Sequence, residues 1–138
     1  MSFNSIYELA GSAMSAQTVR LNTISSNLSN VDSVSGNPNE VYKALKPVFA
    51  SIYDHVQYEQ GVVPVKVADV VSIDNLIQEK FEPNNPLSNE EGYVYYSGIN
   101  VISEMADMMS ATRSFEADVQ VLNNVKSMQQ SLIRIWEI

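Results

Sequence analysis

Few residues in this chain have the type and spacing that catalysis requires. The sequence of 138 residues contains one histidine, His55, which follows Asp54 in a strand-like stretch from 53 to 58. A histidine acts as acid or base only beside a partner group and a substrate, and a lone one is more often a surface or packing residue. Glu116 and Asp118 lie two residues apart in a helical pattern, so their carboxylates point to different faces.

Motifs that bind phosphates and metals are also absent from the sequence. The chain has no glycine-rich phosphate loop, no nucleophile elbow, no HExxH zinc helix and no calcium loop. It has no cysteine, which excludes thiolate nucleophiles, thiolate metal sites and disulfides. We therefore predict no catalytic residue, no metal and no cofactor, and a protein that is not an enzyme.

Charge and composition favour contacts with other proteins. Sixteen acidic residues against eight basic ones give a formal net charge of −8, which disfavours binding to nucleic acid or anionic lipid. Charged residues make up only 17% of the chain, and much of its polarity comes from 18 serines and 13 asparagines, which cost little to desolvate against a protein. No stretch approaches the roughly 20 apolar residues that span a bilayer, and the first residues lack a secretory signal pattern. We predict no membrane insertion.

An apolar period of three and four residues predicts a first helix over residues 3–31. Its seam consists of Phe3, Tyr7, Ala10, Met14, the polar Gln17, Leu21, Ile24, Leu28 and Val31. Ser5 and Glu8 could form a capping box, which would start the helix near residue 5. Gly11 lies inside this pattern, where a glycine costs about 1 kcal/mol relative to alanine. Close approach of a second helix would offset that cost.

A longer period predicts a second helix from Asn100, a favourable N-cap, with Glu104 in its first turn. Its seam is Val101, Met105, Met108, Thr112, Phe115, Val119, Leu122, Lys126, Gln129, Ile133 and Trp136. An adjacent apolar row is Val121, Val125, Met128, Leu132 and Ile135. A helix that is apolar on two sides requires more than one partner.

The expected fold class is mainly α with a small β part. The second helix would be roughly 55 Å long, whereas a compact domain of this length would be about 37 Å across. We therefore expect an elongated antiparallel pair of N- and C-terminal helices, joined by a short β-hairpin or loop region. Residues 1–32 and 99–138 would form one helical core domain, and 33–98 a β-hairpin and loop extension.

Strand candidates within this extension are 42–53, 62–71 and 93–96, and a loop over 75–91 would return the chain to the second helix. Pro64 would restrict the second candidate strand to an edge or a bulge.

Two segments resemble the bacterial flagellar rod and hook axial protein family. The N-terminal one runs from Ala10 to Gln17, through Arg20, Leu21 and Asn22, to Ser25–Ser33. The C-terminal one, similar to the proximal rod members, comprises Gly92, Tyr93, Val94, Ile99, Asn100, Val101, Glu104, Met105, Met108, Ser110, Ala111, Arg113, Ser114, Phe115, Ala117, Val121, Leu122, Asn123, Lys126 and Ser127. The short length and the lack of a large inserted domain also fit the proximal rod members.

The resemblance implies a structural subunit of the flagellar basal-body rod, which crosses the periplasm as a drive shaft for motility. It implies export by the flagellar type III system without a cleaved signal, with Phe3 and Tyr7 as a possible export signal. Its partners would be copies of itself, other rod proteins, and base ring and export gate proteins. The alternatives are a generic coiled-coil adaptor or another axial protein of the same family.

Assembly would occur through coiled-coil-like packing of the terminal helices. The expected subunit interface is Tyr7, Ala10, Met14, Leu21, Ile24, Leu28, Val31, Met105, Met108, Phe115, Val119, Leu122, Val125, Met128, Leu132 and Trp136.

Overall fold

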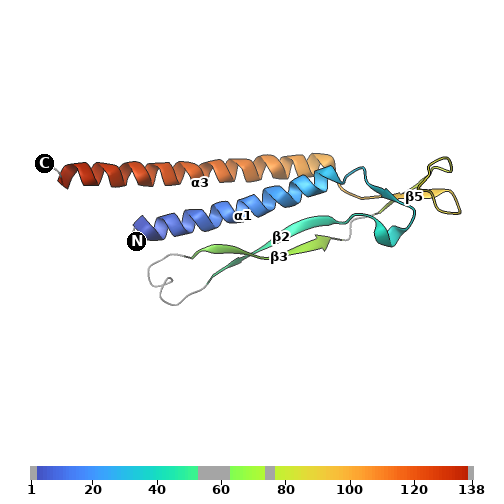
Figure 1. Cartoon of the computed structure of the whole chain (residues 1–138), viewed down its shortest axis with the longest axis horizontal. Coiled ribbons are helices and arrows are strands. Elements are labelled where there is room, and N and C mark those ends of the chain that lie inside the picture. Colours follow the sequence, from blue (N-terminus) through green and yellow to red (C-terminus); the bar gives the residue numbers. More distant parts are fainter. Residues whose placement is uncertain (1–2, 53–62, 74–76, 137–138) are drawn as a thin grey trace.

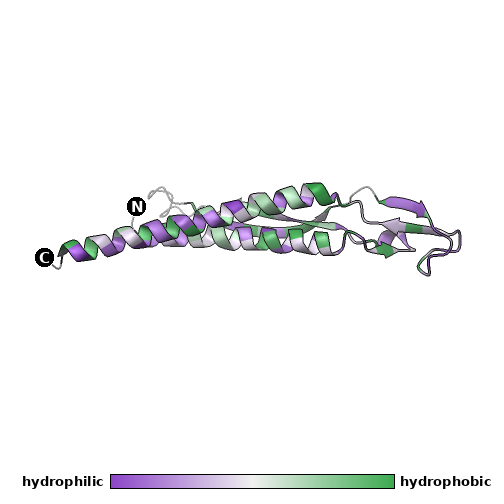
Figure 2. Cartoon of the chain, turned by 90° about the horizontal axis from the view of Figure 1, so that it is seen from above, coloured by the Kyte–Doolittle hydropathy of each residue, from purple (hydrophilic) through white to green (hydrophobic). Residues whose placement is uncertain are grey.

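The computed structural model describes residues 3–52, 63–73 and 77–136, and the molecule is elongated (Figure 1). Helix α1 (Phe3–Ser29) lies beside helix α3 (Val101–Trp136) and runs in the opposite direction. A two-stranded β-ribbon lies alongside α1. A second sheet lies beyond the helices, at the end of the molecule away from both termini. Figure 2 shows hydrophobic residues interspersed with hydrophilic ones along both helices.

The ends of the helices follow from local hydrogen bonds. Helix α3 starts after Asn100, whose Oδ1 accepts a hydrogen bond from the Ser103 amide at 3.1 Å, which confirms the expected N-cap. Helix α1 begins at Phe3, so Ser5 already lies inside the helix and the expected start near residue 5 is wrong. It ends where the Asn30 amide bonds to the carbonyls of Ser26 and Asn27.

The strands form two antiparallel sheets. Strands β2 (Ala44–Ser51) and β3 (Val65–Ile73) make the ribbon, with an irregularity between Val48 and Phe49. Strands β1 (Val34–Ser35), β5 (Tyr93–Tyr96) and β4 (Gln78–Phe81) make a sheet in the order β1-β5-β4, and a short 3₁₀ helix, η1 (Pro38–Glu40), connects β1 to β2.

The expected fold class is wrong, because a short hairpin does not describe the region between the helices. The described residues contain five strands in two sheets, and the ribbon packs along α1. Strand β4 lies inside the segment expected to be a loop, since its sequence Gln-Glu-Lys-Phe has no alternating apolar pattern. It forms because it pairs with β5, and β1 is too short to show a period. Pro47 is tolerated in β2 because each strand of a two-stranded ribbon is an edge strand.

Small and branched side chains form the core between these elements. The buried apolar residues are Ala10, Ala16 and Ile24 in α1, Val41, Ala44, Val94 and Ile99 in the middle of the chain, and Ala111 and Val125 in α3. Alanine at the contact lets helix backbones approach closely. Within the described ranges, no helix has the length and apolar character to cross a membrane.

Candidate interaction surfaces and the polar junction

The face of α3 that packs inside the subunit is defined by residues spaced one heptad apart. Glu104, Ala111 and Val125 are buried, and Met108 and Leu122 between them are half-buried. At the far end of this seam, the Tyr7 hydroxyl donates to Gln129 Oε1 at 3.3 Å. The seam therefore differs from the expected one at its start, because Met105 points to solvent with 54% of its surface exposed.

The expected interface residues divide between the interior and the surface of this subunit. Ala10, Ile24 and Val125 are buried; Tyr7, Met14, Leu21, Leu28, Val31, Met108, Phe115, Val119 and Leu122 are half-buried; Met105, Met128 and Leu132 are exposed; and Trp136 lies in the last turn of α3. The expected export residues Phe3 and Tyr7 occupy the first turns of α1 and are half-buried. The exposed members have most of their side-chain surface open to solvent, so they are the ones that a neighbouring subunit could cover.

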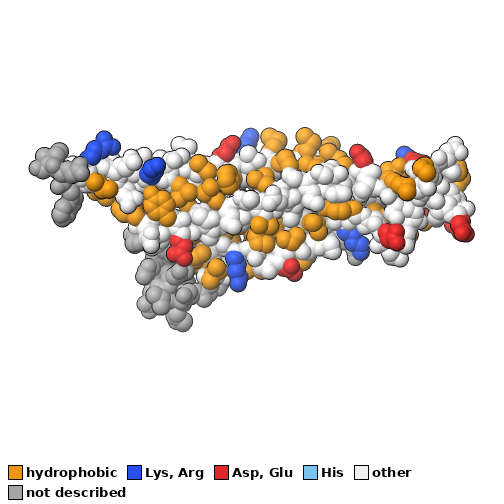
Figure 3. Space-filling model, in the orientation of Figure 1, with side chains coloured by type: hydrophobic (Ala, Val, Ile, Leu, Met, Phe, Trp, Pro, Cys, Tyr) orange, Lys and Arg blue, Asp and Glu red, His pale blue; other side chains and the backbone are white. Residues whose placement is uncertain are grey.

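Most of the exposed large apolar side chains of α3 fall into two separate groups. The first flank is Val101, Ile102, Met105 and Met109, and the second flank is Val121, Met128 and Ile135. Leu132 and Ile133 are also exposed, and Leu132 continues the heptad spacing of the buried face one repeat beyond Val125. At about 100° per residue, these flanks lie on opposite sides of the buried face. Figure 3 shows hydrophobic side chains at the surface over both halves of the helix pair. The expected interface does not include Val101, Ile102, Met109, Val121 and Ile135. Val101 belongs to the expected seam of the second helix, and Val121 and Ile135 belong to the adjacent apolar row.

A buried polar cluster joins α1, β2 and α3, and we name it the polar junction. Asn27 is fully buried and donates from Nδ2 to the Leu45 carbonyl at 3.0 Å and to Glu104 Oε2 at 2.9 Å. Its Oδ1 accepts from the Leu45 amide at 2.8 Å and from the Tyr42 hydroxyl at 3.1 Å. Both donors and both acceptor positions of this side-chain amide therefore have partners.

Ion pairs complete the polar junction. Lys46 Nζ lies 2.8 Å from Glu104 Oε1 and 3.0 Å from Asp107 Oδ2, and Arg20 Nη2 lies 3.2 Å from Asp107 Oδ1. Burial disfavours the charged Lys46, but hydrogen bonds and attraction from both acids outweigh it and raise the pKa of this ammonium. The hydrogen bond from Lys46 lowers the pKa of Asp107, against a smaller opposing effect of burial. The two positive charges of Arg20 and Lys46 balance the two negative charges of Glu104 and Asp107. The cluster therefore holds α1, β2 and α3 together.

Sequence reasoning missed the polar junction. Glu104 was interpreted only as an acid favoured by the helix dipole, and Lys46 lies 58 residues away from it in the chain. One signal was available, because Arg20, Asn27 and Glu104 all belong to the segments that resemble the axial protein family.

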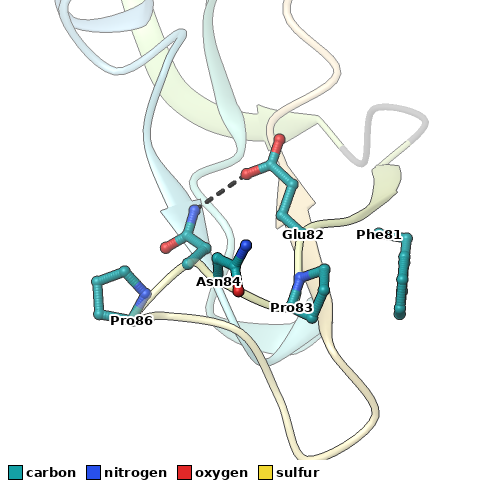
Figure 4. Close-up of a pocket in the computed structure, with 6 residues that line it drawn as sticks. Phe81, Glu82, Pro83, Asn84 and Pro86 are labelled. Atoms are coloured by element: carbon teal, nitrogen blue, oxygen red, sulfur yellow. Dashed lines mark hydrogen bonds between the residues drawn. The ribbon is translucent and has the colours of Figure 1, made fainter.

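A shallow pocket at the far sheet is lined by Phe81, Glu82, Pro83, Asn84, Asn85 and Pro86 (Figure 4). Glu82 accepts hydrogen bonds from Asn85 at 3.1 Å, from the Tyr96 hydroxyl and from Lys80 at 2.9 Å. The bonds from Lys80 and Asn85 lower the pKa of Glu82, and the bond to Glu82 raises the pKa of Lys80. These bonds tie the turn to strands β4 and β5.

The other candidate chemical groups remain apart in the structure. Glu116 is exposed and Asp118 half-buried, as two positions on different helix faces should be. Among the described residues, no three acidic or histidine side chains cluster closely enough to hold a metal ion. His55 lies outside the described residues.

Comparison with known proteins gives matches at both ends and over the full length. The family described as "Flagella basal body rod protein" matches residues 8–36, and the family "Flagellar basal body rod FlgEFG protein C-terminal" matches residues 90–135. Proteins named flagellar basal-body rod protein FlgC are similar throughout. The Escherichia coli protein is 43% identical over 139 residues, covering 99% of this chain and 100% of the relative. The Salmonella typhimurium protein is 42% identical over 137 residues with the same coverage, and the Agrobacterium fabrum protein is 34% identical over 128 residues, covering 91% and 89%.

Proposed function

The chain belongs to the FlgC family of flagellar basal-body rod proteins, and from this premise we propose how its helices build the rod. It is a structural subunit of the rod, which serves bacterial motility. The observation that carries this conclusion is similarity over the whole length of relatives with that name, together with matches to both terminal segments.

We propose that subunits polymerise through coiled-coil-like packing of the terminal helices. Residues 1–32 and 99–138 would form the packing core, and 33–98 would extend from it. The support is the exposed apolar surface of α3 that remains after α1 has covered one face. Burying such surface stabilises association by about 25 cal/mol per Å² before the entropy of association is subtracted.

We further propose that the chain carries out no reaction, and that its partners are copies of itself, other rod proteins, and base ring and export gate proteins. In this proposal it crosses to the periplasmic space through the flagellar type III system without a cleaved signal, and Phe3 and Tyr7 serve as the export element. Both side chains lie in the first turns of α1 and are half-buried in the folded subunit, so a receptor would bind them before α1 packs on α3.

Substitutions one turn apart on α3 test the packing proposal. Met109 and Ala106 are both exposed, but only Met109 belongs to a flank, and Ala106 belongs to neither. Met109→Asp should strongly reduce incorporation into purified basal bodies, because it places a charge in a desolvated contact. Ala106→Asp adds the same charge outside both flanks and should incorporate normally. Equal incorporation of both variants at the wild-type level would contradict packing through this face of α3.

A further inference from the structure

The exposed residues of α1 form a single narrow stripe. We name it the outer stripe, and it consists of Asn4, Glu8, Gly11, Ser15, Thr18, Asn22, Ser25 and Ser29. The spacing alternates between three and four residues, which is the period of a contact with another helix. One of these eight residues is charged, whereas the water-facing side of a soluble helix usually carries many charges. The composition therefore fits contact with protein better than contact with water.

Gly11 faces open space in the described part of the subunit. A Cβ atom at this position would meet nothing within 4 Å among the described residues. Glycine weakens a helix interior because it adds conformational freedom to the unfolded chain. Neither α3 nor the ribbon needs the space at Gly11, so the subunit alone gives no reason for a glycine there.

Helix α3 carries a row with the matching period and larger side chains. This outer row is Ser114, Ala117, Val121, Asn124, Met128, Ser131 and Ile135, and every member is exposed except Ser114, which is half-buried. It contains no charged residue, and Met128 and Ile135 are 60% and 68% exposed. The row also adjoins the seam inside the subunit, since Val125 is buried while Val121 and Met128 on either side of it are not.

We propose that the outer stripe of α1 receives the outer row of α3 from a second copy of the chain, with an apolar side chain of that row seated over Gly11. This inference rests on the proposed packing of terminal helices and names the faces that meet. Large side chains on one helix and small ones on the other interdigitate as knobs into holes. At 1.5 Å per residue, the two faces extend over about 38 and 32 Å, so their lengths match.

The second copy is favoured as the occupant for two physical reasons. Each copy carries both faces at different places, and a contact between unlike faces repeats from one subunit to the next, as a helical rod requires. Copies of a chain with a net charge of −8 repel one another, and a contact between the stripe, with one charged residue, and the row, with none, adds little to that repulsion.

Substitutions at Gly11 separate the stability of the subunit from its assembly. Gly11→Ala and Gly11→Leu should both raise the thermal midpoint of the free subunit, because the site is open and both residues favour helix over glycine. Gly11→Leu should lower incorporation into basal bodies by at least about tenfold, and Gly11→Ala by much less. Normal incorporation of Gly11→Leu, or a lowered thermal midpoint for either variant, would overturn the proposal.

Disulfide trapping identifies the faces directly, because the natural chain has no cysteine. Gly11→Cys is combined in turn with Val121→Cys, Met128→Cys or Ile135→Cys, and assembled rods are oxidised. At least one pair should join two copies. The control pairs Gly11→Cys with Met105→Cys on the first flank, and it should not cross-link.

The outcomes distinguish this inference from the packing proposal. Cross-linking through Met105→Cys alone would overturn the pairing of these faces but leave packing by terminal helices intact. The absence of every cross-link, together with normal incorporation of Met109→Asp, would contradict both.

Discussion

The Asn27→Ala substitution is expected to destabilise the free subunit severely, because this one side chain satisfies groups from two other elements. It makes four hydrogen bonds, at 2.8 to 3.1 Å, to both backbone groups of Leu45, to Tyr42 and to Glu104. Alanine leaves the Leu45 amide and carbonyl without a side-chain partner and removes a donor from the buried carboxylate of Glu104.

The magnitude follows from the number of bonds lost. A hydrogen bond contributes about 1 kcal/mol, and one to a charged group about 1.5–3 kcal/mol, so four bonds give about 5 kcal/mol. The better helix propensity of alanine returns about 0.5 kcal/mol. A net loss of about 4 kcal/mol is a large part of a typical stability of about 5–15 kcal/mol. It corresponds to a fall in the melting temperature of roughly 10–20 °C for a domain of this size.

Urea and thermal unfolding of the purified chain, followed by circular dichroism, measure this loss. The matched control is Asn22→Ala, which makes the same change on the exposed face of the same helix and includes the same gain in propensity. Asn22→Ala should unfold at or above the wild-type midpoint. If the two variants differ by less than about 1 kcal/mol, the four bonds do not hold the subunit together and the reasoning is refuted.

The lowered pKa of Asp107 contributes stability that is present above its ordinary value of 3.8 and lost as pH falls below it, so urea titrations of Asp107→Asn should show a weaker acid dependence than those of Glu116→Gln. Leu28→Asp and Leu122→Asp should each abolish assembly, because both side chains are half-buried in the seam and an unpaired charge is costly there; normal swimming by either strain would show that the seam is misassigned. In dilute monomer, amide hydrogens over 122–136 should exchange fast, since most of these side chains are exposed; core-like protection there, independent of concentration, would contradict this. His55→Ala should leave swimming unchanged, and a motility defect at normal protein level would assign that residue a function.

The helices were the part most accessible from sequence, because their periods are long and Asn100 is a clear cap. The side of α3 that meets α1 was harder to assign. Hydrophobicity ranks Met105 above Ala111, yet Met105 is 54% exposed and Ala111 is fully buried. Close approach of two helices selects small residues, and a count of apolar positions gives them little weight. The sequence alone therefore could not decide which of the adjacent apolar rows of α3 faces α1.

The β region and the polar junction depend on contacts between distant residues. Strand β4 has the polar sequence Gln-Glu-Lys-Phe, and its pairing with β5 decides its conformation. Glu104 and Lys46 are separated by 58 residues, so no local pattern connects them. Gly11 is a different case, because its position in the helix was noted from sequence, but only the structure shows that its own subunit leaves the site open.

Electron cryo-microscopy of purified basal bodies would show whether neighbouring subunits cover α3 of this chain in the rod. We expect density for this chain within the rod, with the exposed apolar residues Met109 and Met128 of α3 in contact with adjacent subunits. Absence of the chain from the rod, or an α3 whose two flanks face open solvent in the assembled rod, would contradict it.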